Sequence, residues 1–413
     1  MPRRSTVRLD NALPLALEGY AWLPNRLRRA DADVLRTRLL GLRAVALHGP
    51  AAARFFYDER NVRRHGAIPG PVQSTLFGHG AVHTLDGAAH RVRKELLVGL
   101  LMNGGIDGLV ERAGAAWQAA ARDWPTRGPV VLFDEVSQVL TRAVCDWTGI
   151  PLTPAEVPEL AADLVAMVDG FATIGPRHWR ARRARTRREN WLAALIEQVR
   201  RGESSAAPGS AVAVVAEHRD TDGRALDACV AAVELLNIIR PTVAVSWFVA
   251  FAGHALHCWP AHRDRLGAAD PAFTEAYAHE VRRFYPFAPF VGGRAVRDLA
   301  WEGVRIPAGA IVLLDLYGQN HDPRLWPEPY RFRPERFLGR EIGAFELVPQ
   351  GGGDPRTGHR CPGELITVAL LRNLAARLAR LAYTVPEQDL RIPLHRIPTR
   401  PVDGLVIEVR PTA

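Results

Sequence analysis

A single cysteine, Cys361, lies between a glycine-rich loop and a strongly helical run, and this combination could bind a metal. Gly351, Gly352 and Gly353 allow unusual backbone torsions and close approach to a flat partner. From Glu364 onward, apolar residues recur at helical spacing. A thiol at a helix N-terminus faces unpaired amide donors and the positive end of the helix dipole, which favours a metal-binding thiolate. The alternative is a small apolar core cysteine near a turn.

An arginine stands inside the most apolar run of the chain, residues 226 to 257. This run predicts a long buried helix that is too interrupted to span a bilayer. Pro241 lacks an amide hydrogen, so it should kink the helix and leave the carbonyl of Asn237 without its usual partner. Arg240 precedes it, and burying an arginine without an anion costs on the order of several kcal/mol. We therefore expect Arg240 to meet either an internal acid, with Glu234 a weak candidate, or an anionic ligand.

Three basic side chains gather near the start of another predicted helix, which Asp86 or Gly87 should cap. His90 and Lys94 are four residues apart and therefore share a face, with Arg93 beside them. These three side chains could clamp an anion, or they could form an ordinary solvated face.

The Cys361 loop and four further segments occur in an order that resembles the cytochrome P-450 superfamily over essentially the whole chain. The longer loop Pro-Gln-Gly-Gly-Gly, followed by Gly-His-Arg-Cys-Pro-Gly-Glu, resembles the fatty-acid peroxygenase branch specifically. Asp354 stands where the superfamily's commonest form has phenylalanine. The further segments are the apolar run with Arg240-Pro241, the pair Glu280 and Arg283, Asn320-His321-Asp322-Pro323, and Pro334-Glu335-Arg336-Phe337.

The resemblance implies a mainly α fold with small β-sheets, in which haem b lies between a long central distal helix and a proximal cysteine loop. It makes Cys361 the thiolate ligand of the iron. It also places six basic or cysteine side chains at the cofactor, with the propionates held by the basic ones: His90, Arg93, Lys94, Arg294, His359 and Cys361.

The same resemblance implies a fatty-acid substrate, because Arg-Pro replaces the superfamily's usual acid and threonine on the long helix. Arg240 would hold the substrate carboxylate, and Arg240 with His83 would be the catalytic residues. A histidine at position 83 is associated by resemblance with alkene-forming members. The substrate would contact Arg240, Pro241, Phe77, Phe171 and Phe290.

The predicted activity is hydrogen-peroxide-dependent oxidation of long-chain fatty acids at the α and β carbons, with some decarboxylation to terminal alkenes. No obligatory redox partner is expected. The alternatives are a conventional monooxygenase that uses NAD(P)H through partner proteins, and a non-catalytic haem or lipid sensor.

Composition restricts the remaining classes. The net charge of +9 could indicate nucleic acid, but Lys94 is the only lysine, and an arginine bias is more easily explained by genomic base composition. The four cysteines follow no zinc or disulfide spacing, which fits a reducing cytoplasm. We expect one haem-thiolate domain over residues 1–413, with no secretory signal, integral membrane anchor or fused reductase.

Local patterns predict several connecting elements. Thr153 to Glu156 forms a capping box, and a very basic helix should resume after Gly175-Pro176. A strand is expected around residues 42–47, and residues 304–312 should form a hairpin around a Pro-Ala-Gly turn. The basic helix should present a wet face of Arg182, Arg183, Arg185, Arg187 and Arg188.

Overall fold

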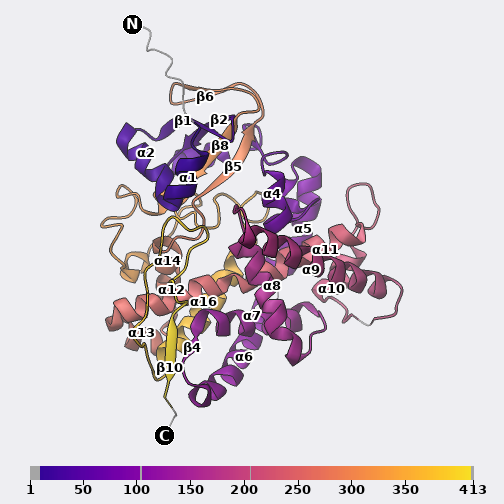
Figure 1. Ribbon diagram of the computed structural model, residues 1–413. Helices are drawn as coiled ribbons and strands as arrows, with labels where there is room; N and C mark the ends of the chain where they lie inside the picture. Colours follow the sequence, from indigo (N-terminus) through magenta and orange to yellow (C-terminus); the bar gives the residue numbers. More distant parts are fainter. Residues whose placement is uncertain (1–9, 103–104, 205, 411–413) are drawn as a thin grey trace.

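The computed structural model describes residues 10–102, 105–204 and 206–410. Figure 1 shows a β-sheet with two short helices at the N-terminal end and a body of helices at the other. The longer helices are α5 Gly87–Met102, α6 Ile106–Arg127, α7 Leu132–Thr148, α8 Val157–Asp169, α9 Pro176–Arg200, α11 Ala228–Val243, α12 Val245–Cys258, α14 Pro271–Phe284 and α16 Glu364–Arg380. The shorter ones are α1 Ala12–Glu18, α2 Trp22–Ala30, α3 Pro50–Phe56, α4 Gly70–Val72, α10 Ala211–Glu217, α13 Arg263–Gly267 and α15 Tyr317–Asn320.

Three small sheets accompany the helices, in the strand orders β1-β2-β8-β5-β3, β4-β10-β9 and β6-β7. The strands are β1 Val34–Leu39, β2 Leu42–Leu47, β3 Val62–Arg63, β4 Val130–Val131, β5 Phe290–Ala295, β6 Leu299–Trp301, β7 Val304–Ile306, β8 Ile311–Asp315, β9 Tyr383–Thr384 and β10 Val406–Val409. The predicted mainly α fold and the strand at 42–47 are confirmed.

The predicted hairpin over residues 304–312 is wrong in its pairing. Both strands form, but β7 pairs with β6, whereas β8 pairs with β2 and β5. The turn that closes a hairpin lies earlier, at Glu302 and Gly303, which both have positive φ angles. The Pro-Ala-Gly turn instead passes the chain from one sheet to another.

The apolar run forms the predicted buried helix, as α11 and α12 with a break at Ala244. Among the described residues, Ala228–Cys258 is the one helix apolar and long enough to cross a membrane, yet 78% of its most apolar window is buried in the protein. A core helix gives the same pattern. The break lies three residues after Pro241. Because this proline has no amide hydrogen, the carbonyl of Asn237 lacks its usual helical hydrogen bond and the helix is weakened here.

The predicted Glu280–Arg283 pair connects α14 to the loops that follow β8. Arg283 donates to Glu280 at 2.7 and 2.8 Å, and both side chains are fully buried. Arg336 joins them, with its Nε 3.1 Å from a Glu280 oxygen, so the predicted ion network is confirmed. Arg283 also donates to the carbonyl of Asn320, which ties in the loop that follows β8.

Two predictions about helix surroundings need correction. The capping box at Thr153 and Glu156 is present, but Asp86 does not cap α5 with its carboxylate. That carboxylate instead accepts hydrogen bonds from the amides of Arg64 and His65. Arg185 is not on a wet face either, because it is 2% exposed and donates to the carbonyl of Leu76.

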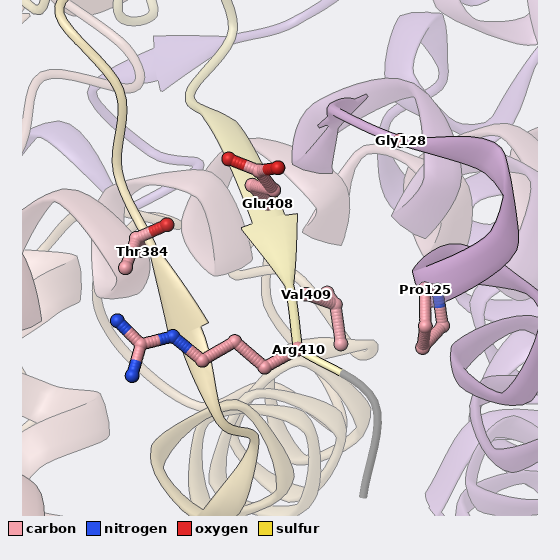
Figure 2. A pocket seen from close by; sticks show the side chains of 6 residues that line it. All are labelled: Pro125, Gly128, Thr384, Glu408, Val409 and Arg410. Atoms are coloured by element: carbon pink, nitrogen blue, oxygen red, sulfur yellow. The ribbon is translucent and has the colours of Figure 1, made fainter.

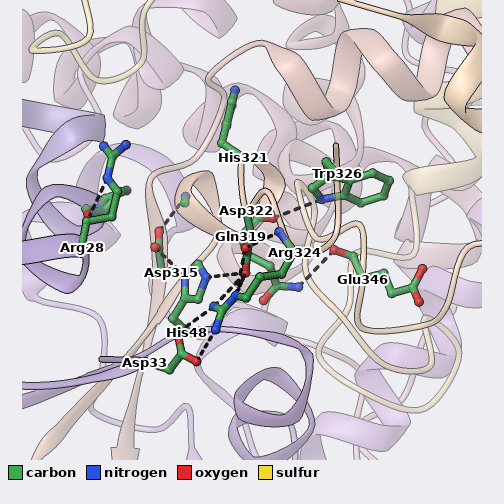
Figure 3. A network of polar contacts seen from close by, with 12 residues as sticks. Arg28, Asp33, His48, Asp315, Gln319, His321, Asp322, Arg324, Trp326 and Glu346 are labelled. Carbon is green, nitrogen blue, oxygen red and sulfur yellow. Dashed lines mark hydrogen bonds and ion pairs between the residues drawn. The ribbon is translucent and has the colours of Figure 1, made fainter. Parts of the chain in front are cut away.

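A partly buried histidine, His48, joins the sheet to the loop after β8, as Figure 3 shows. His48 Nδ1 lies 3.0 Å from Asp315, and its Nε2 lies 3.1 Å from Asp322. Arg324 connects Asp322 to Asp33. Burial lowers the pKa of His48, but hydrogen bonds and charge from the two aspartates outweigh burial and raise its pKa to about 9.

We expect the free energy of unfolding to fall between about pH 7 and pH 9. Because the folded pKa of His48 is about 9 and its unfolded value is 6.5, its contribution is complete below pH 6.5 and is lost as pH rises through 9. The contribution is about 3 kcal/mol at most, at roughly 1.4 kcal/mol per pKa unit. Thermal unfolding of the holoenzyme at several pH values measures it, with His48→Asn as the comparison. An equally steep decline in the variant would assign the slope to other groups.

Candidate active site

Cys361 is held at the end of its loop just before α16. Its amide donates to the carbonyl of Gln350 at 3.2 Å. Burial raises the pKa of the Cys361 thiol, and a hydrogen bond from the Gly363 amide lowers it only in part. Helix α16 begins at Glu364, as predicted, but burial of the sulfur outweighs the stabilisation that the nearby amides give to a thiolate. A bound cation would have to supply the remaining stabilisation.

The loop is fixed by a buried ion network on its proximal side. Glu364 accepts from Arg282 and from Arg360, the latter at 2.6 Å. Burial opposes ionisation, but the two arginines outweigh it and lower the pKa of Glu364 to about 2. Gln350 bridges Arg282 and Thr367 with its side-chain amide. The backbone carrying Cys361 is therefore held at several points.

Four basic side chains form what we call the cationic cluster: Arg64, His90, Lys94 and His359. The rings of His90 and His359 stack at 3.9 Å between centroids. Lys94 Nζ donates to the carbonyl of Arg360 at 2.6 Å. Burial, followed by the charges of His359 and Lys94, lowers the pKa of His90 to about 3. Burial also lowers the pKa of Lys94 to about 8, although the Cys361 charge opposes this.

The acidic groups near the cationic cluster do not supply hydrogen-bond acceptors for all of its nitrogens. Among the described residues, His90 Nδ1 and His359 Nε2 are buried without a hydrogen-bond partner. Glu59 lies 3.8 Å from His90 and 3.4 Å from His359, and Asp86 lies 3.6 Å from His359. These distances are too long for good hydrogen bonds. An additional anion would complete the cluster.

These residues fit haem b. Its two propionates would accept hydrogen bonds from the unpartnered nitrogens of the cationic cluster. Cys361, the residue after Arg360, would supply the sulfur ligand of the iron. The glycine loop is tightly placed, since Gly351 has a φ of +97° and a Cβ there would come 2.6 Å from the Tyr57 hydroxyl. Only glycine meets both demands.

Two predicted propionate ligands lie outside this cluster, and only Arg93 is paired with acids elsewhere. Arg93 donates to Glu234 at 2.8 Å and pairs with Asp220. Arg294 donates to the carbonyls of Gly66 and Gly309. The two carboxylates occupy the Arg93 guanidinium, whereas neutral carbonyls leave the charge of Arg294 unpaired among the described residues, so its role as a propionate ligand stays a prediction. Arg64, a buried member of the cluster, was missed by sequence reasoning.

Arg240 lies on α11 without a carboxylate partner among the described residues. Its Nη2 donates to Asn237 at 3.2 Å, and its Nε has no hydrogen-bond partner. Burial, with the positive charge of Arg185, lowers the pKa of Arg240 to about 9, while the charge of Cys361 acts in the opposite direction. Glu234, the internal candidate, is occupied by Arg93 and by the amide of Val82. Arg240 is therefore a buried cation that lacks an anion.

Three predicted pocket residues come together around the loop before α5. The ring of Phe77 lies 4.8 Å from that of His83 and 6.2 Å from that of Phe171. Burial, followed by the charge of Arg240, lowers the pKa of His83 to about 3, so its imidazole is neutral near pH 7. Phe290 is placed differently, because it packs edge-on against the fully buried Trp22 at 6.1 Å. Phe290 is only partly buried, so its predicted place in the substrate pocket stays a prediction.

Two consecutive carbonyls of this loop are held from different helices. Arg185 of α9 donates a hydrogen bond to the carbonyl of Leu76 at 2.7 Å. Asn237 of α11 donates one to the carbonyl of Phe77 at 3.2 Å. Gly78 has a φ of +84°, and a Cβ there would come 2.8 Å from Val233 Cγ1, so this position favours glycine. Asn237 was missed as a site residue, although its place three residues before Arg240 in an apolar run was a signal.

We expect Glu234→Gln to lower the free energy of unfolding of the holoenzyme by about 3 kcal/mol, because it leaves Arg93 buried beside a neutral group. The carboxylate of Glu234 is fully buried, whereas the side chain of Asp220 is 29% exposed. Asp220→Asn is therefore the matched control, with an expected loss below about 1 kcal/mol. Chemical denaturation of both variants compares them. Equal losses would contradict the assignment of Glu234 as the principal partner.

The cavity of about 330 Å³ in Figure 2 lies away from these residues, between the end of α6 and strands β9 and β10. None of its lining residues belongs to the predicted site. Its lining comprises Pro125, Gly128, Thr384, Glu408, Val409 and Arg410.

Comparisons with known proteins agree with the geometry. A model of the cytochrome P450 family matches residues 270–389. Cytochrome P450 137 of Mycobacterium tuberculosis is 25% identical over 416 residues, covering 94% of this chain and 85% of that protein. Cytochrome P450SP alpha, solved in complex with (R)-ibuprophen, is 40% identical with a TM-score of 0.94, covering 97% of this chain and 98% of that one.

A second solved relative is similar over the same length. Ligand-free cytochrome P450 OleT is 36% identical with a TM-score of 0.95, and 98% of each chain is covered. A variant of it, solved with arachidonic acid, is 35% identical with 99% of each chain covered and a TM-score of 0.95. The chain belongs to the cytochrome P450 family, in the fatty-acid peroxygenase branch, and is an oxidoreductase whose cofactor is haem b.

Proposed function

We propose that this protein uses hydrogen peroxide to oxidise long-chain fatty acids at the α and β carbons, with partial decarboxylation to terminal alkenes. The observation that carries the proposal is the buried guanidinium of Arg240, which meets no carboxylate among the described residues and keeps its Nε free. A buried arginine needs an anion. A fatty-acid carboxylate supplies one through charge-assisted hydrogen bonds.

The substrate carboxylate also supplies the acid–base group. Among the described acids, Glu234 is committed to Arg93, and the α11 run carries no free acid beside Arg240. A carboxylate paired with Arg240 can take a proton from hydrogen peroxide and return it to the leaving oxygen. Haem with a thiolate ligand supplies the oxidising chemistry when it is bound.

Anchoring at Arg240 determines which carbons react. The carboxyl end is fixed, so the α and β carbons stay closest to the reacting centre while the chain extends away along Pro241, Phe77 and Phe171. His83 is neutral and has a free Nδ1, so it can exchange a hydrogen bond with peroxide or with the carboxylate. We propose that this histidine favours some alkene formation.

Peroxide alone tests the proposal. Purified holoenzyme, myristic acid and hydrogen peroxide should give 2- and 3-hydroxy acids and some terminal alkene by gas chromatography. A reaction with NAD(P)H, reductase and ferredoxin, with catalase added to remove peroxide, is the comparison. Product that forms only in the second reaction would show a conventional partner-dependent monooxygenase. Spectral change on adding fatty acid, with no product in either reaction, would show a sensor.

A further inference from the structure

A second arginine without an anionic partner lies in the C-terminal segment. Among the described residues, the guanidinium of Arg400 forms no hydrogen bond and no ion pair, and its Nε and Nη1 are buried. Its guanidinium carbon packs 3.9 Å from the ring centroid of Phe133. A cation–π contact of this kind offsets only part of the cost of removing a charge from water. Arg400 therefore shares with Arg240 the lack of a counter-ion.

The charges around Arg400 do not neutralise it. Arg177 and Arg396 share the carboxylate of Asp169, at 3.0 and 2.5 Å. That acid is therefore committed to two other arginines. Asp134 lies nearby but forms no ion pair within 4.0 Å among the described residues. Three arginines thus stand against two acids, and burial, followed by the charge of Arg396, lowers the pKa of Arg400.

No other acidic side chain of the protein supplies the counter-ion. The residues outside the described ranges are 1–9, 103–104, 205 and 411–413, and none of them is Asp or Glu. The side chain of Arg400 is partly exposed, so a dissolved anion can reach the guanidinium from solvent. The vacant donors of Arg400 therefore suit an anion from outside the chain.

The position of these arginines relates them to the predicted fatty-acid pocket. Asp169 is the last residue of α8, and the predicted pocket residue Phe171 follows two residues later. Arg177 of α9 donates to the carbonyl of Ile397, which holds the C-terminal segment against this turn. The neighbouring cation of Arg400 is Arg396, whereas that of Arg240 is Arg185. The two unpaired arginines therefore belong to different surroundings.

We propose that Arg400 and Arg396 bind an oxyanion, a carboxylate or a phosphate group, at a site separate from Arg240. The Nε of each arginine is buried and has no hydrogen-bond partner among the described residues, so each offers a vacant donor. A guanidinium pairs with either group through parallel hydrogen bonds. The oxyanion belongs either to a small free anion or to the far end of a dicarboxylic acid held at Arg240. Only the second source rests on the proposed function.

Calorimetric titration of the substrate-free holoenzyme with inorganic phosphate tests the first source. We expect saturable binding that Arg400→Gln weakens by about tenfold or more. Arg391→Gln is the matched control, because this arginine lies in the same segment but is exposed and already paired with Asp389. It should bind phosphate as the unaltered protein does. Arg240→Ala should also keep this binding, which separates the site from the substrate anchor.

Hexadecanedioic acid and palmitic acid test the second source, with the change in haem absorption as the measure of binding. For this source, the dicarboxylic acid should bind more tightly than palmitic acid. Arg400→Gln should remove that advantage and leave the affinity for palmitic acid unchanged. A positive result in either titration supports the site and identifies its ligand.

Two outcomes would overturn the proposal. One is phosphate binding that Arg400→Gln does not weaken, together with no advantage of the dicarboxylic acid that this variant removes. The other is phosphate binding that Arg240→Ala loses and Arg400→Gln keeps, because that result would place the anion at the substrate anchor.

Haem absorption confirms that each variant is folded. If Arg400→Gln does not fold, Arg400→Lys replaces it, since it keeps the charge without the fork and should also weaken binding. Peroxide-driven oxidation of palmitic acid by the Arg400 variant should proceed at the normal rate. Absence of that product from the unaltered protein would refute the proposed function and leave the phosphate titration as the test of this site.

Discussion

Arg240→Ala is expected to reduce kcat/KM for a long-chain fatty acid by about thirtyfold or more. The variant loses a charge-assisted anchor worth at least ~2 kcal/mol, together with the positioning of the carboxylate. Initial rates of peroxide-driven product formation, at several fatty-acid concentrations, give this value. Because the guanidinium is buried with an unpartnered Nε, its removal should not lower the stability of the substrate-free enzyme.

Two further variants test whether the loss in kcat/KM is specific to the guanidinium of Arg240. Arg240→Lys keeps the charge without the two-pronged geometry, so it should retain part of the turnover. Arg183→Ala removes an exposed arginine of α9, and it should leave kcat/KM unchanged. Fatty-acid oxidation by Arg240→Ala at the normal rate would refute the carboxylate anchor.

Cys361→Ala should abolish peroxide-driven oxidation of fatty acids and remove the carbon monoxide absorption band typical of thiolate-ligated haem. No other cysteine is placed to substitute: Cys145 is fully buried on α7, and Cys229 and Cys258 are exposed. Absorption spectra with carbon monoxide, and haem content per chain, measure the loss. Cys229→Ser serves as the control and should keep the normal band. Retention of that band in Cys361→Ala would refute the assigned ligand.

Much of the architecture could be predicted, because the informative signals are local. The buried helix around Arg240, the capping box at Thr153, and the Glu280–Arg283 pair each depend on residues close together in sequence. Periodicity, proline chemistry and side-chain spacing suffice for such features. The resemblance then supplied the order of the elements around them.

The features that local patterns do not reveal are pairings between distant segments. Arg93 lies three residues from His90 and looks equivalent to it, yet its partner Glu234 is 141 residues away on α11. Arg64 was missed because no local pattern separates a buried arginine from the many exposed ones in this arginine-rich chain. Phe290 follows an apolar turn, but only the strand register shows that its ring meets Trp22.

The solitary charge on α11 has a thermodynamic consequence. An enzyme that keeps an uncompensated guanidinium inside its core is least stable when empty, and each molecule that neutralises the charge should raise its melting temperature. A fatty acid and the primary alcohol of equal chain length bring the same hydrocarbon but differ in charge. Melting curves with the two should therefore differ widely, so heat alone could rank candidate substrates by their head groups.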